Sequence, residues 1–289
     1  MTHYLGITFA VVALFGWGAG DFLIQRTARL LGSSKALFFI GTTGLLGLLP
    51  LVADDLMKLT GNAVTFLVFL GIVVVVVTTL DFEALRKGKI AIIEPVVGLE
   101  LPITVGLSVV LAGETLSLAQ IGIILLVFMG ILMAVTSQPI AWKARNRAFE
   151  KGVVLALISA IGMAFTNVLV GISSQDISPF VTIWFTHSML AVVCGLYIIG
   201  KGNARSLSVD IMQRPRLILG QSILDNVAWV SFAKATTLVP IAIATTISES
   251  YIALAVLLGV FINKEKLSRH QVTGVGLTIV GISVLSYMS

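Results

Sequence analysis

The chain has 289 residues, of which 57% are hydrophobic and 11% are charged, with a formal net charge of +5 and a mean hydropathy of +1.04. Soluble domains carry about 25% charged residues, so this composition excludes a water-soluble globular fold and predicts an integral membrane protein. The basic residues lie in short segments between apolar runs, where they orient a membrane protein rather than bind nucleic acid. One cysteine, Cys194, excludes an intrachain disulfide bond.

Ten apolar runs follow one another along the chain, and a membrane-spanning helix needs about 20 such residues. The alternating segments of a membrane β-barrel are absent, so the runs predict an all-α membrane protein with ten transmembrane helices. The first run has no basic segment before it and is expected to be retained. We place the helices at about 4–24, 35–53, 62–82, 89–112, 117–135, 152–172, 179–200, 215–233, 238–262 and 268–287.

The second half of the chain repeats the first. A shift of 151 residues brings the segment Glu-Thr-Leu-Ser-x-x-Gln at 114–120 onto Glu-Lys-Leu-Ser-x-x-Gln at 265–271, and a shift of 146 brings Asp21 onto Asn167. Each half holds five predicted helices, and because five is odd the second half enters the membrane inverted. The predicted divisions are a first five-helix repeat at 1–139, a basic cytoplasmic linker at 140–151 and an inverted second repeat at 152–289.

The basic residues alternate between loops in agreement with this count. Of the 19 lysines and arginines, all but Lys58 and Lys234 lie in the odd-numbered predicted loops. Lys/Arg-rich loops stay on the cytoplasmic side. We therefore expect a multi-pass protein of the cell membrane with both termini outside the cytoplasm.

Two further motifs accompany the duplicated five-helix pattern. Gly-Glu-Thr-Leu-Ser at 113–117 follows the fourth predicted helix, and Glu-Leu-Pro at 100–102 lies inside it. With these features the whole chain resembles the ten-helix EamA-type members of the drug/metabolite transporter superfamily. The resemblance implies a carrier that works by alternating access, with its site between inverted repeats near the membrane midplane. It leaves the substrate open, because members move amino acids, sugars, nucleotide-linked compounds, amines and drugs.

The chain lacks the GxxxxGK[ST] phosphate-binding loop, so ATP hydrolysis on this chain is not expected. Transport would then be secondary active or facilitative, with no cofactor and no metal. The expected partners are the lipid bilayer, a small-molecule substrate and H⁺ or Na⁺. The chain would act as a monomer or a homodimer.

Carboxylates inside membrane helices are costly and mark functional sites by default. Glu100 and Glu249 are the candidates for proton or cation coupling, because a buried carboxyl group can take up a proton near neutral pH. Glu249 lies within two positions of Tyr251, the repeat counterpart of Glu100. Glu94 lies six residues before Glu100 and therefore on a different face. The alternative for both coupling candidates is a glutamate hydrogen-bonded within the bundle.

Aromatic residues accompany other polar residues at helical spacing. Trp17 and Asp21, and likewise Asp225 and Trp229, are four residues apart, while Trp184 and His187 are three apart, so each pair shares a helix face. An aromatic face beside a carboxylate suits a cationic or zwitterionic ligand. Helix packing and the membrane interface are the alternative for the tryptophans, and a structural role for His187. The predicted substrate-binding residues are Trp17, Asp21, Glu94, Asn167, Trp184, His187, Asp225, Trp229 and Tyr251.

Other acidic residues lie at the ends of predicted helices. Asp81 and Glu83 either line a cavity mouth or lie at the membrane interface. Glu114 and Glu265 each precede a Ser-x-x-Gln capping box. For these two we predict helix capping in a tight turn rather than a role in transport.

The distribution of basic residues limits the substrate. Apart from Lys234, no lysine or arginine lies well inside a predicted helix, whereas phosphorylated ligands call for basic partners. We expect a small amine, an amino acid or a neutral amphipathic metabolite. A nucleotide or a phosphorylated sugar is the alternative within transporters.

Two other classes compete with a transporter. Gly-Ala-Gly-Asp at 18–21 fits the GxGD pattern of intramembrane aspartyl proteases, which need two aspartates that share a proton. The Tyr-Asp and Pro-Ala-Leu motifs of presenilin-like proteases are absent. A passive channel would show rings of repeated charge. We therefore expect no enzymatic activity, and we expect Asp21, five residues before Arg26, near the cytoplasmic mouth, either at the rim of the cavity or at the membrane interface.

Overall fold

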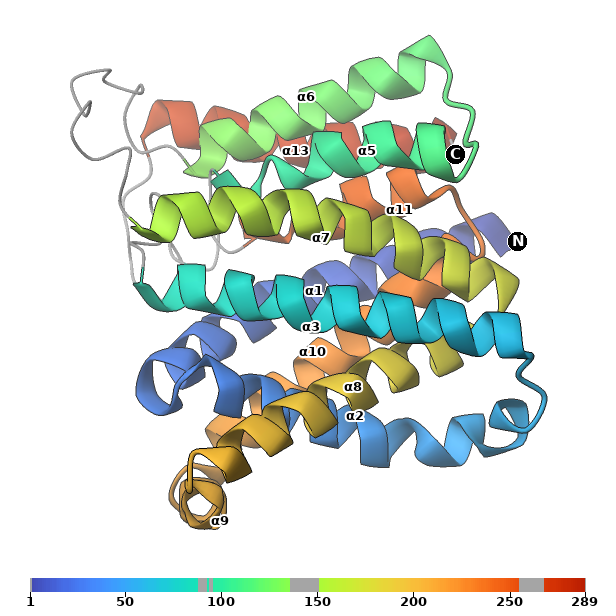
Figure 1. Cartoon of the computed structure of the whole chain (residues 1–289). Coiled ribbons are helices and arrows are strands. Elements are labelled where there is room, and N and C mark those ends of the chain that lie inside the picture. The colour runs from blue at the N-terminus through green and yellow to red at the C-terminus, as the bar shows by residue number, and fades with distance from the viewer. Residues whose placement is uncertain (1, 88–92, 94–95, 136–150, 255–267, 289) are drawn as a thin grey trace.

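The computed structural model describes residues 2–87, 93, 96–135, 151–254 and 268–288 (Figure 1). These residues form helices and turns but no strand, which confirms the predicted all-α class. The helices are α1 (Thr2–Leu31), α2 (Ser33–Leu56), α3 (Gly61–Lys87), α5 (Glu100–Leu111), α6 (Leu118–Val135), α7 (Lys151–Asp176), α8 (Pro179–Gly200), α9 (Ala204–Gln213), α10 (Pro215–Thr236), α11 (Ile241–Ser248) and α13 (Arg269–Met288). The predicted linker at 140–151 lies almost wholly outside the described residues.

Within the described ranges, seven helices are long and apolar enough to cross a membrane, namely α1, α2, α3, α6, α7, α8 and α13. Helix α5 and the segment Ile241–Leu254 are apolar but shorter. Helix α10 has 22 residues, as α8 does, but it is more polar because it buries Gln221, Ser222, Asp225 and Asn226. The chain is thus a multi-pass membrane protein, and the count of ten spans stays a prediction.

Two of the predicted helices are interrupted. A turn at Gly98 and Leu99 precedes α5, and a turn at Glu249 and Ser250 follows α11. The expectation of continuous helices at 89–112 and 238–262 was therefore wrong at these positions. Shifting the first turn by 151 residues gives the second, so both repeats break at equivalent places. Irregular backbone at membrane depth is tolerated where it is buried in protein or lines a cavity.

The two repeats pack through symmetry-related helix pairs. Helix α1 packs on α10 and α3 packs on α7, while α2 packs on α8 and α6 on α13. In the predicted numbering these are helices 1 with 8, 3 with 6, 2 with 7 and 5 with 10. If the two repeats are exchanged, the pair of helices 1 and 8 becomes the pair of helices 6 and 3. The pairs 2 with 7 and 5 with 10 are each unchanged by the exchange. This is the packing expected of two inverted repeats, and it confirms that part of the fold prediction.

Glycines allow the equivalent pairs to approach closely. A methyl group added at Gly16 on α1 would lie 2.8 Å from the Cβ atom of Ala228 on α10. A methyl group at Gly162 on α7 would lie 2.6 Å from Cγ2 of Val77 on α3. Gly16 and Gly162 are related by the shift of 146, and Val77 and Ala228 by the shift of 151, so the fold builds the same contact twice.

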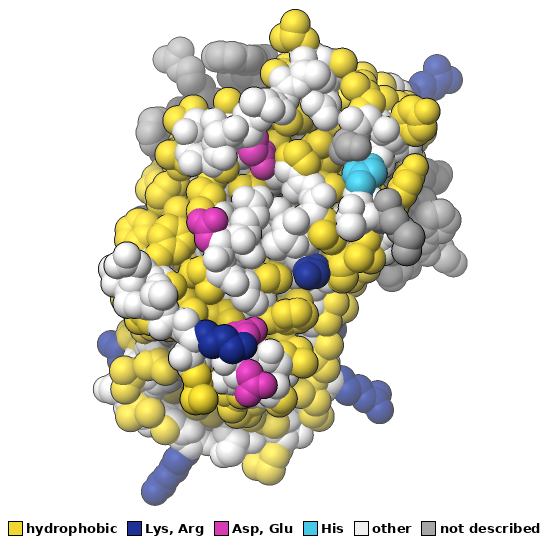
Figure 2. Space-filling view, turned by 90° about the vertical axis from the view of Figure 1, so that its right-hand side faces the viewer, with side chains coloured by type: hydrophobic (Ala, Val, Ile, Leu, Met, Phe, Trp, Pro, Cys, Tyr) yellow, Lys and Arg dark blue, Asp and Glu magenta, His cyan; other side chains and the backbone are white. Residues whose placement is uncertain are grey.

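The two ends of the bundle differ in charge. Both termini lie at one end (Figure 1), which fits an even number of crossings. Figure 2 looks onto this end and shows a few acidic and basic side chains among many apolar and uncharged ones. The opposite end holds the basic ends of α1, α2 and α3, with Arg26, Arg29, Lys35, Arg86 and Lys87. That this basic end faces the cytoplasm remains a prediction.

The turn between α5 and α6 reaches across to the other repeat. Glu114 follows Gly113, whose φ of 68° favours glycine. Its carboxylate accepts hydrogen bonds from the backbone N–H groups of Ile241 and Ala242, the latter at 3.0 Å. An acidic group at this position satisfies free N–H groups in the first turn of α11 and complements the helix dipole. Glu114 thus caps a helix as predicted, but the helix belongs to the second repeat.

The two Ser-x-x-Gln boxes are also confirmed. Ser117 and Gln120 exchange hydrogen bonds of 2.9 and 3.2 Å before α6, and Ser268 and Gln271 exchange bonds of 3.0 and 3.3 Å before α13. Glu265 lies outside the described residues. Equivalent helices of the two repeats therefore begin with the same local structure.

The contact between α6 and α13 generates a stability prediction. A methyl group at Gly274 would lie 2.5 Å from the backbone nitrogen of Ala134 and 2.6 Å from the carbonyl oxygen of Gly130, whereas Gly276 on the same helix meets nothing within 4 Å. Gly274→Ala should destabilise the protein by about 1–3 kcal/mol through overpacking. Gly276→Ala should be neutral or slightly stabilising, because alanine favours helix. Thermal unfolding of the detergent-purified protein measures both, and an equal loss in the two variants would contradict the prediction.

The hydrogen bonds from α11 to Glu114 generate a second stability prediction. Glu114→Ala should lower the free energy of unfolding by about 1–3 kcal/mol, because two N–H groups at the start of α11 lose a charged acceptor. The control is Asp55→Ala, which removes an exposed ion pair with Lys58 and should cost less than about 1 kcal/mol. Denaturation of both variants in the same detergent gives the comparison. Similar stabilities would show that the cap contributes little.

Candidate functional site

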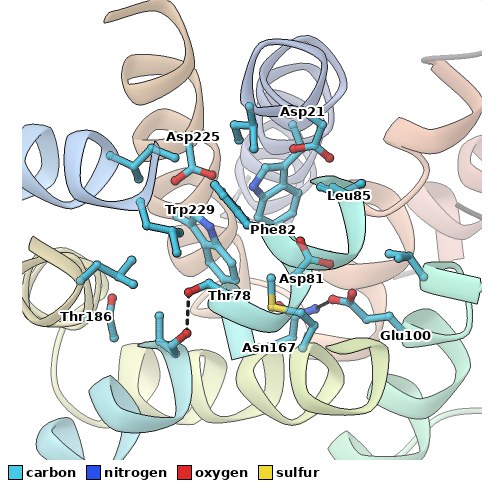
Figure 3. Close-up of a pocket in the computed structure, with 18 of the residues that line it drawn as sticks. Asp21, Thr78, Asp81, Phe82, Leu85, Glu100, Asn167, Thr186, Asp225 and Trp229 are labelled. Carbon is cyan, nitrogen blue, oxygen red and sulfur yellow. Dashed lines mark hydrogen bonds between the residues drawn. The ribbon is translucent and has the colours of Figure 1, made fainter. Parts of the chain in front are cut away.

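A cavity lies between the two repeats, lined by α1, α2, α3, α5, α7, α8, α10 and the turn after α11 (Figure 3). Its lining uses equivalent positions of both repeats. The shift of 146 relates Trp17 to Met163, Asp21 to Asn167, Ile24 to Val170 and Ile40 to Thr186. The shift of 151 relates Val74 to Asp225, Thr78 to Trp229 and Glu100 to Tyr251. The cavity therefore lies on the axis that exchanges the repeats.

The side chains at these equivalent positions differ in chemistry. Trp17, Trp229 and Tyr251 come from the α1, α10 and α11 side, whereas their counterparts are methionine, threonine and glutamate. Together with Phe232 they form an aromatic cluster: Trp17 lies 5.1 Å from Trp229, 5.6 Å from Phe232 and 6.3 Å from Tyr251, measured between ring centroids. One flank of the cavity thus carries this aromatic cluster, while the opposite flank has Phe82 of α3 in its described lining.

Acidic side chains dominate the charge of the cavity. Glu100, Glu249 and Asp225 are 5%, 6% and 7% exposed, while Asp21 and Asp81 are partly buried. All five line the cavity, and its described lining includes no lysine or arginine. Buried carboxyl groups are stabilised by protons, by cations or by hydrogen-bond donors. A ligand that carries a positive charge or donors therefore suits this cavity better than an anion.

A direct hydrogen bond crosses between the repeats at Glu100. The side-chain amide of Asn167 on α7 donates to Oε1 of Glu100 at 2.6 Å (Figure 3). Glu100 is the first residue of α5, directly after the turn at Gly98 and Leu99, and Glu249 occupies the equivalent turn in the second repeat. Each helix interruption thus places a carboxylate in the cavity.

A second polar group joins α8 and α10. His187 Nδ1 lies 2.7 Å from Asn226 Oδ1, and His187 Nε2 lies 3.9 Å from Asp225 Oδ2. Asn226 in turn donates to the carbonyl oxygens of Ile40 on α2 and Ser222 on α10, at 3.0 and 2.8 Å. The imidazole is thus held from one side and faces a carboxyl group on the other.

The structure brings most of the predicted site residues together. Those that line the cavity are Trp17, Asp21, Glu100, Asn167, His187, Asp225, Trp229, Glu249 and Tyr251. Their roles remain proposals. Glu94 lies outside the described residues.

Trp184 does not line the cavity. Its Nε1 donates to the carbonyl oxygen of Leu45 on α2 at 3.0 Å, and its ring packs against Val52, Leu67 and Val181. Three-residue spacing places Trp184 on the same side of α8 as His187, but the larger ring turns into the contact between α8 and α2. The structure therefore places Trp184 in a packing contact outside this cavity.

Several cavity residues were missing from the predicted set, among them Thr78, Met163 and Thr186. The repeat could have found Thr78 and Met163, because they are the counterparts of Trp229 and Trp17. Asp81 lines the cavity, which answers the question left open for it. Its neighbour Glu83 instead binds Arg86 and Lys87 at 2.8 Å each and accepts a 2.9 Å hydrogen bond from Ser33 of α2.

The cavity extends toward the basic end of the bundle. Its lining includes Ile24, two residues before Arg26, and Leu37, two residues after Lys35. It also includes Leu85, two residues before Lys87.

The comparisons with known proteins agree with this architecture. Twenty-six chains of solved structures match. One of them, described as the crystal structure of a protein, aligns with a TM-score of 0.72 over 98% of this chain and 96% of its own, at 15% identity, which is a likeness of fold alone. A comparison with curated proteins finds no match. The model of the EamA-like transporter family matches residues 4–136 and again residues 150–287. Because two successive matches cover nearly the whole sequence, the chain belongs to the EamA-like transporter family.

Proposed function

We propose that this protein is a secondary transporter, active or facilitative, that moves a small organic amine across the cell membrane by alternating access between its inverted repeats. The observation that carries the proposal is the cavity between the repeats, which combines five carboxylates with an aromatic cluster and has no lysine or arginine in its described lining. Family membership supports transport. The chemistry of the cavity supports the substrate class.

Charge is the main argument for an amine. A phosphorylated ligand would add anionic charge to an acidic space that offers no basic partner, and a buried unpaired charge is costly. An ammonium group instead carries a charge opposite to that of the acidic cavity lining. An amino acid would bring one compensating charge and one further carboxylate. Among the small metabolites that the sequence allows, the cationic amine fits best.

The aromatic cluster supports the same class. Trp17 and Trp229 both line the cavity and are only 6% and 9% exposed. A cation over the face of tryptophan gains about 0.5–1 kcal/mol at exposed sites and about 2 kcal/mol or more when desolvated. The indole rings also provide apolar surface for the carbon skeleton of the substrate.

Glu100 and Glu249 are our candidates for coupling transport to protons. Each lies at a helix interruption, and the two interruptions are equivalent in the two repeats. Carriers with inverted repeats often bind substrate and coupling ions at such discontinuous helices. The hydrogen bond from Asn167 to Glu100 links opposite repeats, so a change of charge at Glu100 would act on the contact between them.

The extension of the cavity supports an orientation. If the basic end faces the cytoplasm, the described conformation is the one whose cavity extends toward the cytoplasm, and both termini lie outside. Asp21, which is partly buried and lies five residues before Arg26, would then belong to the cytoplasmic half of the cavity wall.

An intramembrane protease is the competing function. The cavity does hold Asp21 together with Asp81 and Asp225, and a protease needs two aspartates that share one proton. Cleavage of a transmembrane peptide that is abolished by Asp21→Asn would favour this alternative. Substrate accumulation in sealed vesicles without any cleavage would exclude it.

The substrate class can be tested by ligand-dependent thermal stability, since a ligand that binds the folded state raises its melting temperature. Primary and quaternary amines should raise the melting temperature of the purified protein, while nucleotides and sugar phosphates should not. Trp17→Phe should weaken amine binding about 3- to 30-fold through loss of cation–π stabilisation. Trp184→Phe, outside the cavity, is the matched control and should bind normally. Stabilisation by polyanions alone would overturn the proposed class.

The coupling role can be tested in proteoliposomes with the amine that stabilises the protein most. Glu100→Gln and Glu249→Gln should each reduce uptake driven by a pH gradient about 5- to 150-fold, the usual range of coupling between two sites. Exchange of labelled for unlabelled amine at equal pH should persist, because it needs no net proton movement. Glu83→Gln, outside the cavity, should leave both activities intact. An unchanged pH dependence in both cavity variants would rule these residues out.

A further inference from the structure

The contact between α8 and α10 contains a histidine whose protonation state is constrained by its neighbours. The constraint begins with Asn226. Its side-chain nitrogen lies 3.0 Å from the carbonyl oxygen of Ile40 and 2.8 Å from that of Ser222. Carbonyl oxygens only accept hydrogen bonds, so the amide must present its NH₂ group to them. The oxygen of Asn226 therefore faces His187.

This orientation decides which imidazole nitrogen of His187 carries a proton. Asn226 Oδ1 is an acceptor and lies 2.7 Å from Nδ1 of His187, so Nδ1 must donate. In the neutral ring only one nitrogen bears a proton. Neutral His187 is consequently held with its proton on Nδ1 and a lone pair on Nε2, the reverse of the preference of the free histidine side chain in water.

The lone pair on Nε2 faces a carboxyl group. Asp225 Oδ2 lies 3.9 Å away, and the two side chains are 3% and 9% exposed. With His187 neutral and Asp225 ionised, two electron-rich atoms would face each other in a nearly dry environment. One added proton on His187 converts this contact into an ion pair, and one on Asp225 removes its negative charge.

The surrounding packing keeps the pair in this arrangement. On α2, a methyl group at Gly44 would lie 2.6 Å from Nδ1 of His187 and closer still to Oδ1 of Asn226. The backbone of α2 therefore lies directly behind the imidazole and the amide, so neither can turn away. The absence of a side chain at Gly44 makes room for the hydrogen bond between them.

The other titratable groups in the described cavity lining are four carboxyl groups and one phenol. They are Asp21 from α1, Asp81 from α3, Glu100 from α5, and Glu249 and Tyr251 after α11, while the described cavity residues of α2 and α7 are uncharged. Their negative potential favours an additional proton in the cavity. None of them belongs to α8 or α10.

We propose that His187 and Asp225 form a proton-binding site that holds one proton between them, and that Asn226 is the positioning residue that directs Nε2 of His187 toward Asp225. The site is distinct from Glu100 and Glu249, and its existence requires neither of them nor a substrate. Asp225 and Trp229 both line the cavity from α10 (Figure 3). The proton on this pair therefore sets the charge that a cavity ligand meets on this flank, a consequence that rests on the proposed function.

The proposal can be tested without transport, by nitrogen NMR of the imidazole ring in lipid nanodiscs. The chain has three histidines, so His3→Gln with His270→Gln leaves His187 alone. The spectrum of the neutral ring should show the proton on Nδ1, and Nε2 should be the nitrogen that gains a proton on acidification. A neutral ring protonated on Nε2 would overturn the proposal.

The role of Asp225 is tested in the same variant, in which His187 is the remaining histidine. With Asp225→Asn, the ring should lose its proton at a pH lower by about one unit or more, the usual effect of removing a nearby opposite charge. Asp81→Asn, which removes another cavity carboxylate, should shift the titration less. Equal shifts in the two variants would show that no specific pair exists. Asn226→Leu should yield a mixture of both neutral ring forms, and an unchanged Nδ1–H form would exclude the positioning role. If that variant does not fold, the Asp225→Asn comparison decides alone.

Discussion

The cost of placing carboxylates inside a membrane protein is the constraint around which this structure is arranged. Glu100, Asp225 and Glu249 are almost fully buried, and lipid offers them neither water nor counterions. The fold answers by gathering them around one cavity and by supplying donors such as the amide of Asn167. It also breaks two helices there, where backbone groups freed from the helical ladder can be satisfied. The polar character of α10 has the same cause, since its buried face supplies Asp225 and Asn226.

The inverted repeat provides a symmetric frame for an asymmetric site. Equivalent glycines, Gly16 and Gly162, set equivalent helix contacts, and the cavity wall uses equivalent positions. The side chains at equivalent cavity positions differ between the two repeats. Where one repeat offers Trp229 and Tyr251, the other offers Thr78 and Glu100. The flank that carries the aromatic cluster thus faces a flank that carries hydrogen-bonding groups, and a ligand between them would contact both repeats at once.

The sequence was sufficient for the class of fold, the repeat and the buried carboxylates of the cavity wall, because hydropathy and the cost of buried charge act on single residues. Asp21, Glu100, Asp225 and Glu249 could be found for this reason. The helix interruptions at Gly98-Leu99 and Glu249-Ser250 were not expected, because both lie in apolar runs. The first has a local cause, since Pro102 cannot donate the helical hydrogen bond to the carbonyl oxygen of Gly98. Helical spacing also misplaced Trp184: it gives the direction of a Cβ atom, whereas the contact with α2 decides where the large ring lies. The partner of Glu114 was hidden because it is distant in sequence.

That distant contact has a consequence for how the protein is made. Glu114 caps α11 across 127 residues of sequence. The carboxylate belongs to the half that leaves the ribosome first, and the helix that it caps belongs to the half that follows. The first half therefore presents the acceptor before the N–H groups exist, and the start of α11 is completed only when the second half docks correctly. The same hydrogen bonds that close a helix end thus act as a check that two oppositely inserted halves have been assembled in register.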